Sequence, residues 1–482
     1  MLNHRLVFQF LGLLLLIEGI FMWLCLPVSI MFADHELLPL GVGGLISIVF
    51  GGSMWLVNLG ARKTLTARDG FLIVSIGWIL FSLFGCVPFL LSGEIDNFTD
   101  AFFETVSGFT TTGASILNEV EMLPHGLLFW RSLTQWLGGM GIIVMSLAIL
   151  PLLGVGGMQL FMAEVPGPAP DKLHPRIKET AKRLWAIYII FTLAETLLLW
   201  AGGMDLFDAV CHSFTSMATG GYSTKTASLA YWDSPFIHYV IVLFMFLAGT
   251  NFTLSYFAFH LNFRKVWRNE EFRYYLGFVV GFTVLLTLIL SLTEEQPLEA
   301  SFRHSAFQVV SIVTTTGFVT YDYLSWIPLA GILLFLMMFL GGSAGSTGGG
   351  IKILRIVLFL KNASLELKRL IHPSAVIPVR FNRNAVPPDI LNNVFAFISF
   401  YLITVIVGVI VMAAMGYDLG TSFGAVAATL GNIGPGIGMV GPVDNYSHVP
   451  VLGKWFLSFL MLIGRLELFT VLVLFSPGFW RK

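Results

Sequence analysis

Four short loops rich in glycine and threonine are the part of this 482-residue sequence best suited to chemistry. Closely spaced backbone carbonyl oxygens that point at one axis replace the water around a dehydrated cation. Glycine permits the unusual dihedral angles that such carbonyls require. The loops read Phe-Thr-Thr-Thr-Gly (109–113), Met-Ala-Thr-Gly-Gly-Tyr (217–222), Val-Thr-Thr-Thr-Gly-Phe (313–318) and Gly-Asn-Ile-Gly-Pro (431–435).

The loops form an imperfect internal repeat with a period of roughly a hundred residues. They align on one glycine each, and the helix expected after each loop carries a second glycine. A single loop of this kind would be an ordinary turn, but four similar copies favour the lining of a cation pore. The loop glycines are Gly113, Gly221, Gly317 and Gly434, and the helix glycines are Gly139, Gly249, Gly342 and Gly464.

The composition indicates that lipid surrounds most of the chain. Hydrophobic residues make up 56% and charged residues 11%, against about 25% charged residues in soluble proteins. The mean hydropathy is +0.83. The net charge of −1 gives no reason to expect nucleic acid as a partner. Cys25, Cys86 and Cys211 lie far apart, which fits neither a metal site nor a disulfide framework.

Ten apolar stretches reach the length of about 20 residues that a membrane-spanning helix needs. Four shorter stretches, each ending in one of the loops, lie between pairs of them, and we expect helices that enter the membrane and turn back. Their negative C-terminal ends would favour a cation. The spans are 5–32, 37–58, 70–92, 126–153, 181–202, 236–261, 274–292, 326–360, 390–415 and 451–476, and the short helices are 98–110, 206–218, 298–313 and 418–430.

Lysine and arginine gather in the connections on one side of these ten spans, and that side is therefore expected to be cytoplasmic. Both termini fall on it, whereas all four loops open toward the opposite, acid-rich side. The basic connections include 62–68, 172–183, 264–273 and 361–383. The stretches 172–183 and 361–383 are candidate docking sites for a regulatory protein, although simple anchoring explains them equally.

The predicted fold is an all-α polytopic membrane protein. Two leading transmembrane helices precede four pseudo-symmetric repeats of transmembrane helix, pore helix and transmembrane helix around a central pore. The expected divisions are 1–68 for the leading segment, then 69–155, 156–262, 263–361 and 362–482 for the four pore repeats.

Over nearly its whole length, this pattern resembles the Trk/Ktr/HKT superfamily of K⁺ transporters. The resemblance implies uptake of K⁺ across the bacterial inner membrane. It implies a homodimer with one pore per protomer, and a cytosolic ring of TrkA-type nucleotide-binding regulatory subunits. The implied K⁺ ligands are Thr111, Thr112, Gly113, Thr219, Gly220, Gly221, Thr315, Thr316, Gly317, Asn432, Ile433 and Gly434. The second and fourth loops depart most from Thr-Thr-Gly, which suggests a filter less symmetric than that of a tetrameric channel.

The segment from Gly341 to Gly350 consists of ten small residues, six of them glycine. Each glycine in a helix costs about 0.5–1 kcal/mol relative to alanine, so we expect a break in the span here. A phosphate-binding loop is a poor interpretation because the GK[ST] ending is absent. Close packing of small residues remains an alternative for Gly341 and Gly345. The resemblance implies a gating loop that includes Gly345, Ser346, Thr347, Gly348 and Gly349.

Arg465 lies in the middle of the last predicted span, where a charge costs about 2.5–3.5 kcal/mol or more. Glu467 is not expected to be its partner, because helical residues two apart point in different directions. Two roles stay open: an ion pair with another helix, or a positive charge in the pore, which the resemblance favours. Glu18 and Glu195 are further carboxylates within spans, for which we expect packing or hydrogen-bonding roles.

Two other function classes compete with a channel-like pore. An alternating-access carrier, including a Na⁺- or H⁺-coupled K⁺ symporter, usually contains inverted repeats, whereas these four loops all enter from one face. An intramembrane enzyme is disfavoured, since the sequence contains no HExxH or paired-histidine motif. We therefore expect no enzymatic activity, and K⁺ as transported ion rather than bound cofactor.

Overall fold

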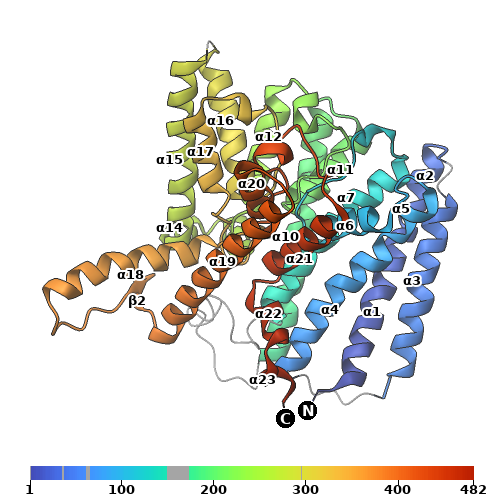
Figure 1. Cartoon of the computed structure of the whole chain (residues 1–482), viewed down its shortest axis with the longest axis horizontal. Coiled ribbons are helices and arrows are strands. Elements are labelled where there is room, and N and C mark those ends of the chain that lie inside the picture. The colour runs from blue at the N-terminus through green and yellow to red at the C-terminus, as the bar shows by residue number, and fades with distance from the viewer. Residues whose placement is uncertain (1, 35–36, 61–65, 149–172, 295, 482) are drawn as a thin grey trace.

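The computed structural model describes residues 2–34, 37–60, 66–148, 173–294 and 296–481. The predicted all-α fold is confirmed: two leading spans are followed by four units, each with a pore helix between two other helices (Figure 1). The only strands in these ranges form a two-residue hairpin, β1 (Arg380–Phe381) and β2 (Asn384–Ala385). The predicted boundary at 155/156, residues 149–153 of one predicted span and Lys172 lie outside the described residues.

The leading segment contains α1 (His4–Trp23), α2 (Leu26–Met31) and α3 (Leu37–Val57). Helices α1 and α3 pack closely because glycines face each other along their contact. A Cβ atom on Gly12 would lie 2.6 Å from the carbonyl oxygen of Gly51, and one on Gly19 would lie 2.6 Å from that of Gly44. The other faces of both helices carry exposed apolar side chains, as expected for helices in lipid.

The four repeats share one order of elements. Each short pore helix is followed by a filter loop, a 3₁₀ turn and a second helix. The first contains α4 (Ala67–Gly85), α5 (Val87–Ser92), pore helix α6 (Phe98–Phe109), η1 (Val120–Met122) and α7 (His125–Ala148); the second contains α10 (Leu173–Ala201), pore helix α11 (Leu206–Met217), η3 (Ser228–Tyr231), α12 (Pro235–Ala248), α13 (Phe252–Phe259) and α14 (Phe263–Arg268).

The other two repeats follow the same order, with a longer interruption in the third. The third contains α15 (Glu270–Thr293), pore helix α16 (Leu298–Val313), η4 (Tyr323–Ser325), α17 (Pro328–Met337) and α18 (Ile353–Ile371); the fourth contains α19 (Pro388–Ala414), pore helix α20 (Leu419–Leu430), η5 (Gly438–Val440), α21 (Val451–Arg465), α22 (Phe469–Leu472), η6 (Val473–Phe475) and α23 (Pro477–Trp480).

Three of the predicted spans are broken: two bend where no break was predicted, and the third is interrupted at the glycine-rich segment, as predicted. The span 236–261 bends by 110° between α12 and α13, and the span 451–476 bends by 110° between α21 and α22. In the span 326–360, α17 ends after ten residues and the chain is irregular until α18, which points away from the bundle (Figure 1). Within the ranges that the structure describes, six helices are long and apolar enough to cross a membrane without a break, and the number of crossings rises to eight if each bent pair counts as one.

Local backbone features mark the two bends. Asn251 caps α13 by accepting a hydrogen bond from the backbone of Thr253, which starts a new helix after Gly249. Glu467 and Leu468 adopt positive φ angles of 58° and 33°, which stop α21. The start of α1 lies near α23 at the lower edge of Figure 1, where Phe479 packs with Val7 and Phe71.

Candidate functional site

Each filter loop begins as the C-terminal cap of its pore helix. One residue adopts a left-handed conformation, and the next donates its backbone N–H to a carbonyl five residues earlier, as in a Schellman motif. This N–H···O distance is 2.8 Å in all four loops, for the donors Thr112, Gly220, Thr316 and Ile433. The sequence repeat therefore corresponds to a repeat of backbone geometry.

The same two positions in every loop have positive φ. For threonine, a β-branched residue, this is a rare conformation that costs about 1–3 kcal/mol. Such strain is typical of functional sites. The first position has φ of 51° at Thr111, 54° at Thr219, 60° at Thr315 and 55° at Asn432, and the second has 82° at Gly113, 74° at Gly221, 80° at Gly317 and 95° at Gly434.

The four loops close into a ring in chain order. Each loop glycine presses against the carbonyl oxygen of the residue before the next loop's glycine, and the fourth returns to the first. A Cβ atom would lie 2.2 Å from the oxygen of Gly220 if placed on Gly113, 2.0 Å from that of Thr316 on Gly221, 1.8 Å from that of Ile433 on Gly317, and 2.7 Å from that of Thr112 on Gly434. All twelve predicted ligand residues are thus brought together, and only glycine fits the contact position.

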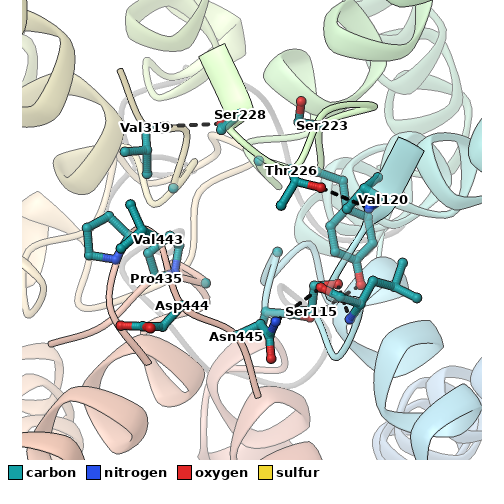
Figure 2. Close-up of a pocket in the computed structure, with 18 of the residues that line it drawn as sticks. Ser115, Val120, Ser223, Thr226, Ser228, Val319, Pro435, Val443, Asp444 and Asn445 are labelled. Carbon is teal, nitrogen blue, oxygen red and sulfur yellow. Dashed lines mark hydrogen bonds between the residues drawn. The ribbon is translucent and has the colours of Figure 1, made fainter. Parts of the chain in front are cut away.

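A cavity of about 130 Å³ opens on one side of this ring, and all four loop glycines line it. Figure 2 shows the loops beyond the filter around this cavity, with Ser115, Ser223, Val319 and Asn445 contributed by the first, second, third and fourth repeats. Lys225 and Asp444 also line it, so the mouth carries both signs of charge.

Hydrogen bonds between consecutive repeats also close this rim. The backbone N–H of Val120 donates to Thr226 Oγ1, and that of Val319 donates to Ser228 Oγ (Figure 2). The remaining joins are Tyr323 Oη donating to the Gly436 oxygen at 2.8 Å and the Tyr446 N–H donating to the Ser115 oxygen at 2.8 Å. Partial burial opposes ionisation of Glu121, but hydrogen bonds from Thr226 outweigh it and lower the pKa of Glu121.

Buried ion pairs hold the pore helices behind the rim. Arg131 Nε donates to Glu104 at 2.8 Å, and Arg131 Nη1 donates to the Ser223 oxygen at 3.0 Å, which ties the first repeat to the second. Lys454 donates to Asp100 at 2.6 Å. Asp208 accepts a hydrogen bond from Thr224 and lies 3.7 Å from Lys225. Asp100 and Asp208 thus connect their pore helices to neighbouring segments of the fold.

The glycine-rich segment crosses directly beneath the filter. The Gly349 N–H donates to Thr315 Oγ1 at 2.7 Å, and Thr347 Oγ1 donates to the Met217 oxygen at 3.1 Å. A Cβ atom on Gly349 would lie 2.6 Å from the Gly431 oxygen.

Residues 341–345 also match the Gly-x-Ser-x-Gly motif of serine hydrolases. The nucleophile elbow of those enzymes needs a strand-to-helix turn, whereas Ser343 lies in an irregular segment and its hydroxyl has no hydrogen-bond partner among the described residues.

Arg465 holds this segment from the opposite wall. It ends α21, and its side chain donates to the carbonyl oxygens of Thr347 at 2.5 Å and Gly138 at 3.1 Å. Within the described residues its contacts include no carboxylate. Glu467 pairs instead with Arg355 at 2.5 Å. The ion-pair interpretation of Arg465 therefore finds no support in these contacts, and the sequence argument against Glu467 as its partner agrees with them.

Two groups near the filter were not predicted. Gln135 of α7 contacts the second loop, and Tyr446 Oη donates to the Gly434 oxygen at 2.9 Å. An uncharged amide inside a predicted span was the available signal for Gln135, because such polar groups seldom face lipid.

Glu18 is buried on α1, and both its carboxylate oxygens lack a hydrogen-bond partner among the described residues. Glu195 is buried on α10.

Comparisons with known proteins agree on one family. The family model described as "TrkH: Cation transport protein" matches residues 41–482. The chain is 45% identical to the Trk system potassium uptake protein TrkH of Escherichia coli K12, over 91% of each chain. It is 43% identical to the Salmonella typhimurium protein of the same name, over 100% of each. The crystal structure of the potassium transporter TrkH from Vibrio parahaemolyticus superposes with a TM-score of 0.92 and 38% identity, covering 100% of both chains.

The superposition on the Vibrio parahaemolyticus structure covers the leading helices and all four repeats. The strained, closed ring of loops lies inside the region that the family model matches. This multi-pass membrane protein belongs to the TrkH family of cation transport proteins.

Proposed function

We propose that this chain is the membrane subunit of a bacterial Trk-type system that takes up K⁺ across the inner membrane. One observation carries the proposal: four loops with the same pair of positive φ angles meet in a closed ring beneath an open cavity. The relatives named as potassium uptake proteins support K⁺ as the ion.

The proposed K⁺ ligands are backbone oxygens of the twelve residues from Thr111 to Gly113, Thr219 to Gly221, Thr315 to Gly317 and Asn432 to Gly434. An ion entering from the cavity would exchange its water for these oxygens one layer at a time. The negative ends of α6, α11, α16 and α20 face the filter, which lowers the cost of removing that water. K⁺ is the cargo in this scheme, and the chain supplies no catalytic group.

The proposed gate is the segment Gly345–Gly349 together with Arg465. The segment contacts the underside of the second, third and fourth loops, and Arg465 fixes it from the fourth repeat. A positive charge this close to the path repels an arriving cation, and low dielectric strengthens that repulsion. The segment would have to move for ions to pass at a useful rate.

The proposed assembly is a homodimer with one pore per protomer, served by a cytosolic TrkA-type nucleotide-binding subunit. The name "Trk system" of the relatives supports a multi-component system. The connections rich in lysine and arginine favour a cytoplasmic position for both termini and for α18. Lys368 and Arg383 are exposed there and could contact an acidic partner surface.

A Na⁺- or H⁺-coupled carrier is the alternative, but the filter loops form one ring with a common orientation, whereas carriers usually use inverted repeats. The deciding experiment is flux through the full-length chain in liposomes under an imposed voltage. A pore predicts that K⁺ flux reverses at a voltage set by the K⁺ gradient alone. A reversal voltage that moves with the proton or Na⁺ gradient at fixed K⁺ would refute the pore.

A further inference from the structure

The filter loops are braced from behind in different ways. In the first and third loops, two threonine hydroxyls pair with each other. Thr110 Oγ1 lies 2.8 Å from Thr112 Oγ1, and Thr314 Oγ1 lies 2.8 Å from Thr316 Oγ1. In both loops the partners stand three residues and one residue before the glycine, so the hydroxyl pair locks the strained residue between them.

The second loop lacks both hydroxyls, because Ala218 and Gly220 occupy these positions. The side chain of Gln135, fully buried on α7 of the first repeat, lies in the vacated space. Its Nε2 donates to the Gly220 oxygen at 2.7 Å, and its Oε1 accepts from the Tyr222 N–H at 3.1 Å. A Cβ atom on Gly220 would lie 2.4 Å from Cδ of Gln135, so this amide and a residue-220 side chain exclude each other.

The oxygen that Gln135 holds is one of the four in the ring. The Gly220 carbonyl is the group against which Gly113 packs, so its direction fixes the junction between the first and second loops. The hydrogen bond from Gln135 Nε2 limits rotation of the Gly220 carbonyl on one side of the loop glycine. The hydrogen bond that the Tyr222 N–H donates to Gln135 Oε1 fixes the backbone on the other side. The amide thus spans Gly221 from both sides.

We propose that Gln135 is a positioning residue that sets the direction of the Gly220 carbonyl and thereby the discrimination between K⁺ and Na⁺. The inference rests on the proposed filter. It assigns to a side chain of the first repeat the role that the threonine pairs fill in the first and third loops. A loop free to collapse would accept the smaller Na⁺ ion, so the loss should appear in selectivity before it appears in total flux.

The first test is Gln135→Leu, which keeps the side-chain bulk and removes both hydrogen bonds. Losing a buried hydrogen bond corresponds to about a fivefold or larger change in an equilibrium. The K⁺/Na⁺ flux ratio of the full-length protein in liposomes should fall by about that factor, with total cation flux retained. If Gln135→Leu fails to fold, Gln135→Met gives the same readout, because the unbranched methionine side chain fills similar space and has no N–H to donate to the Gly220 oxygen.

The second test restores the brace by other means. The triple variant Gln135→Ala/Ala218→Thr/Gly220→Thr removes the amide and supplies the missing hydroxyl pair. Position 218 is equivalent to position 314, where the third loop carries a threonine, because Ala218 packs on Gly139 as Thr314 packs on Gly249. The triple variant should recover most of the K⁺/Na⁺ flux ratio that Gln135→Ala alone loses. No such recovery is expected if Gln135 only contributes to the stability of the fold.

Two reference variants separate the possible failures. Ser132→Ala lies one turn earlier on α7, where the hydroxyl donates to the Leu128 oxygen at 3.0 Å and takes no part in the hydrogen bonds between Gln135 and the second filter loop, and should keep the parental ratio. Gly317→Ser reports on the filter itself. A parental ratio in folded Gln135→Leu or Gln135→Met, with the ratio lost in Gly317→Ser, would overturn the role of Gln135 and leave the filter standing. A parental ratio in Gly317→Ser as well would overturn the filter and this inference together.

Discussion

Arg465 and Thr347 are joined by a hydrogen bond from guanidinium Nη1 to the backbone oxygen at 2.5 Å, directly beneath the filter ring. The bond joins the end of α21 in the fourth repeat to the irregular segment of the third. Since the acceptor is a carbonyl and not a carboxylate, the positive charge is not neutralised by this contact. The predicted effects of altering either partner follow from that arrangement.

Arg465→Ala should increase cation flux. The voltage supplies only about 2.3 kcal/mol per charge per 100 mV, so removing a barrier of one to a few kcal/mol should raise flux about tenfold or more. Single-channel recording and a thermal melt on the same purified variant measure the effect. A silent variant with a lowered melting temperature would contradict it, since that result is what loss of a structural contact produces.

Deleting Gly345–Gly349 should raise basal flux several-fold, on the order of a 1 kcal/mol change in barrier. These residues contact the underside of the filter and carry no apolar core side chain. The deletion and Arg465→Ala should be strongly non-additive, because they act on the same stretch of pore. Additive increases measured in the double variant would place the two features at separate barriers.

Gly317→Ser should abolish K⁺ over Na⁺ discrimination or flux. Its Cβ would lie 1.8 Å from the Ile433 oxygen, and its φ of 80° disfavours any L-residue. The matched control is Gly331→Ala on α17, where nothing lies within 4 Å of the added atom. Ion-flux ratios in liposomes compare the two, and equal ratios in folded proteins would be incompatible with the filter.

Glu467→Gln should destabilise the protein, because it leaves Arg355 charged and unpaired in a site where its side chain is 5% exposed. Breaking a buried pair costs about 3–5 kcal/mol, and partial exposure of Glu467 makes this an upper range. The control Glu366→Gln breaks a surface pair with Arg369 and should cost less than about 1 kcal/mol. Thermal melts in detergent distinguish them, and equal melting temperatures would refute the difference.

Charge reversal at Lys368 and Arg383 should weaken capture of the proposed regulatory subunit and leave basal flux unchanged. Both residues are exposed, whereas the nearby Lys361 is engaged with Glu270 and the Arg380 oxygen. Pull-down of the full chain from native membranes measures the effect. Equal recovery of a nucleotide-binding protein with parent and variant would exclude these residues from the contact.

Much of the fold could be predicted because the loop glycines and the apolar stretches repeat together. Gly113, Gly221, Gly317 and Gly434 occupy equivalent strained positions, as their alignment implied. The bends at 249–251 and 466–468 could not be predicted, because the residues on both sides are apolar and hydropathy carries no information about the direction of the helix axis. At the first bend a tertiary contact adds to the local cap, because the Ser343 N–H of the glycine-rich segment donates to the Gly249 oxygen at 2.9 Å.

The side chains that brace the filter were harder to predict than the filter itself. A glycine at 220 reads as one more flexible loop residue, although a glutamine 85 positions earlier occupies its side-chain space. Likewise Asn432 donates to Thr112 Oγ1 across 320 positions. Such pairings become visible only when the repeats are placed around a common axis, because no local pattern links the partners.

A single chain supplies all four walls of the ring formed by the loop glycines and their neighbouring carbonyls. A single substitution therefore alters one wall of the ring, whereas in a channel of four identical subunits the same substitution alters all four walls. The width and chemistry of such an opening can therefore change in evolution one wall at a time. The mixture of threonine pairs, one glutamine and one asparagine behind the four walls is what that graded tuning would leave behind.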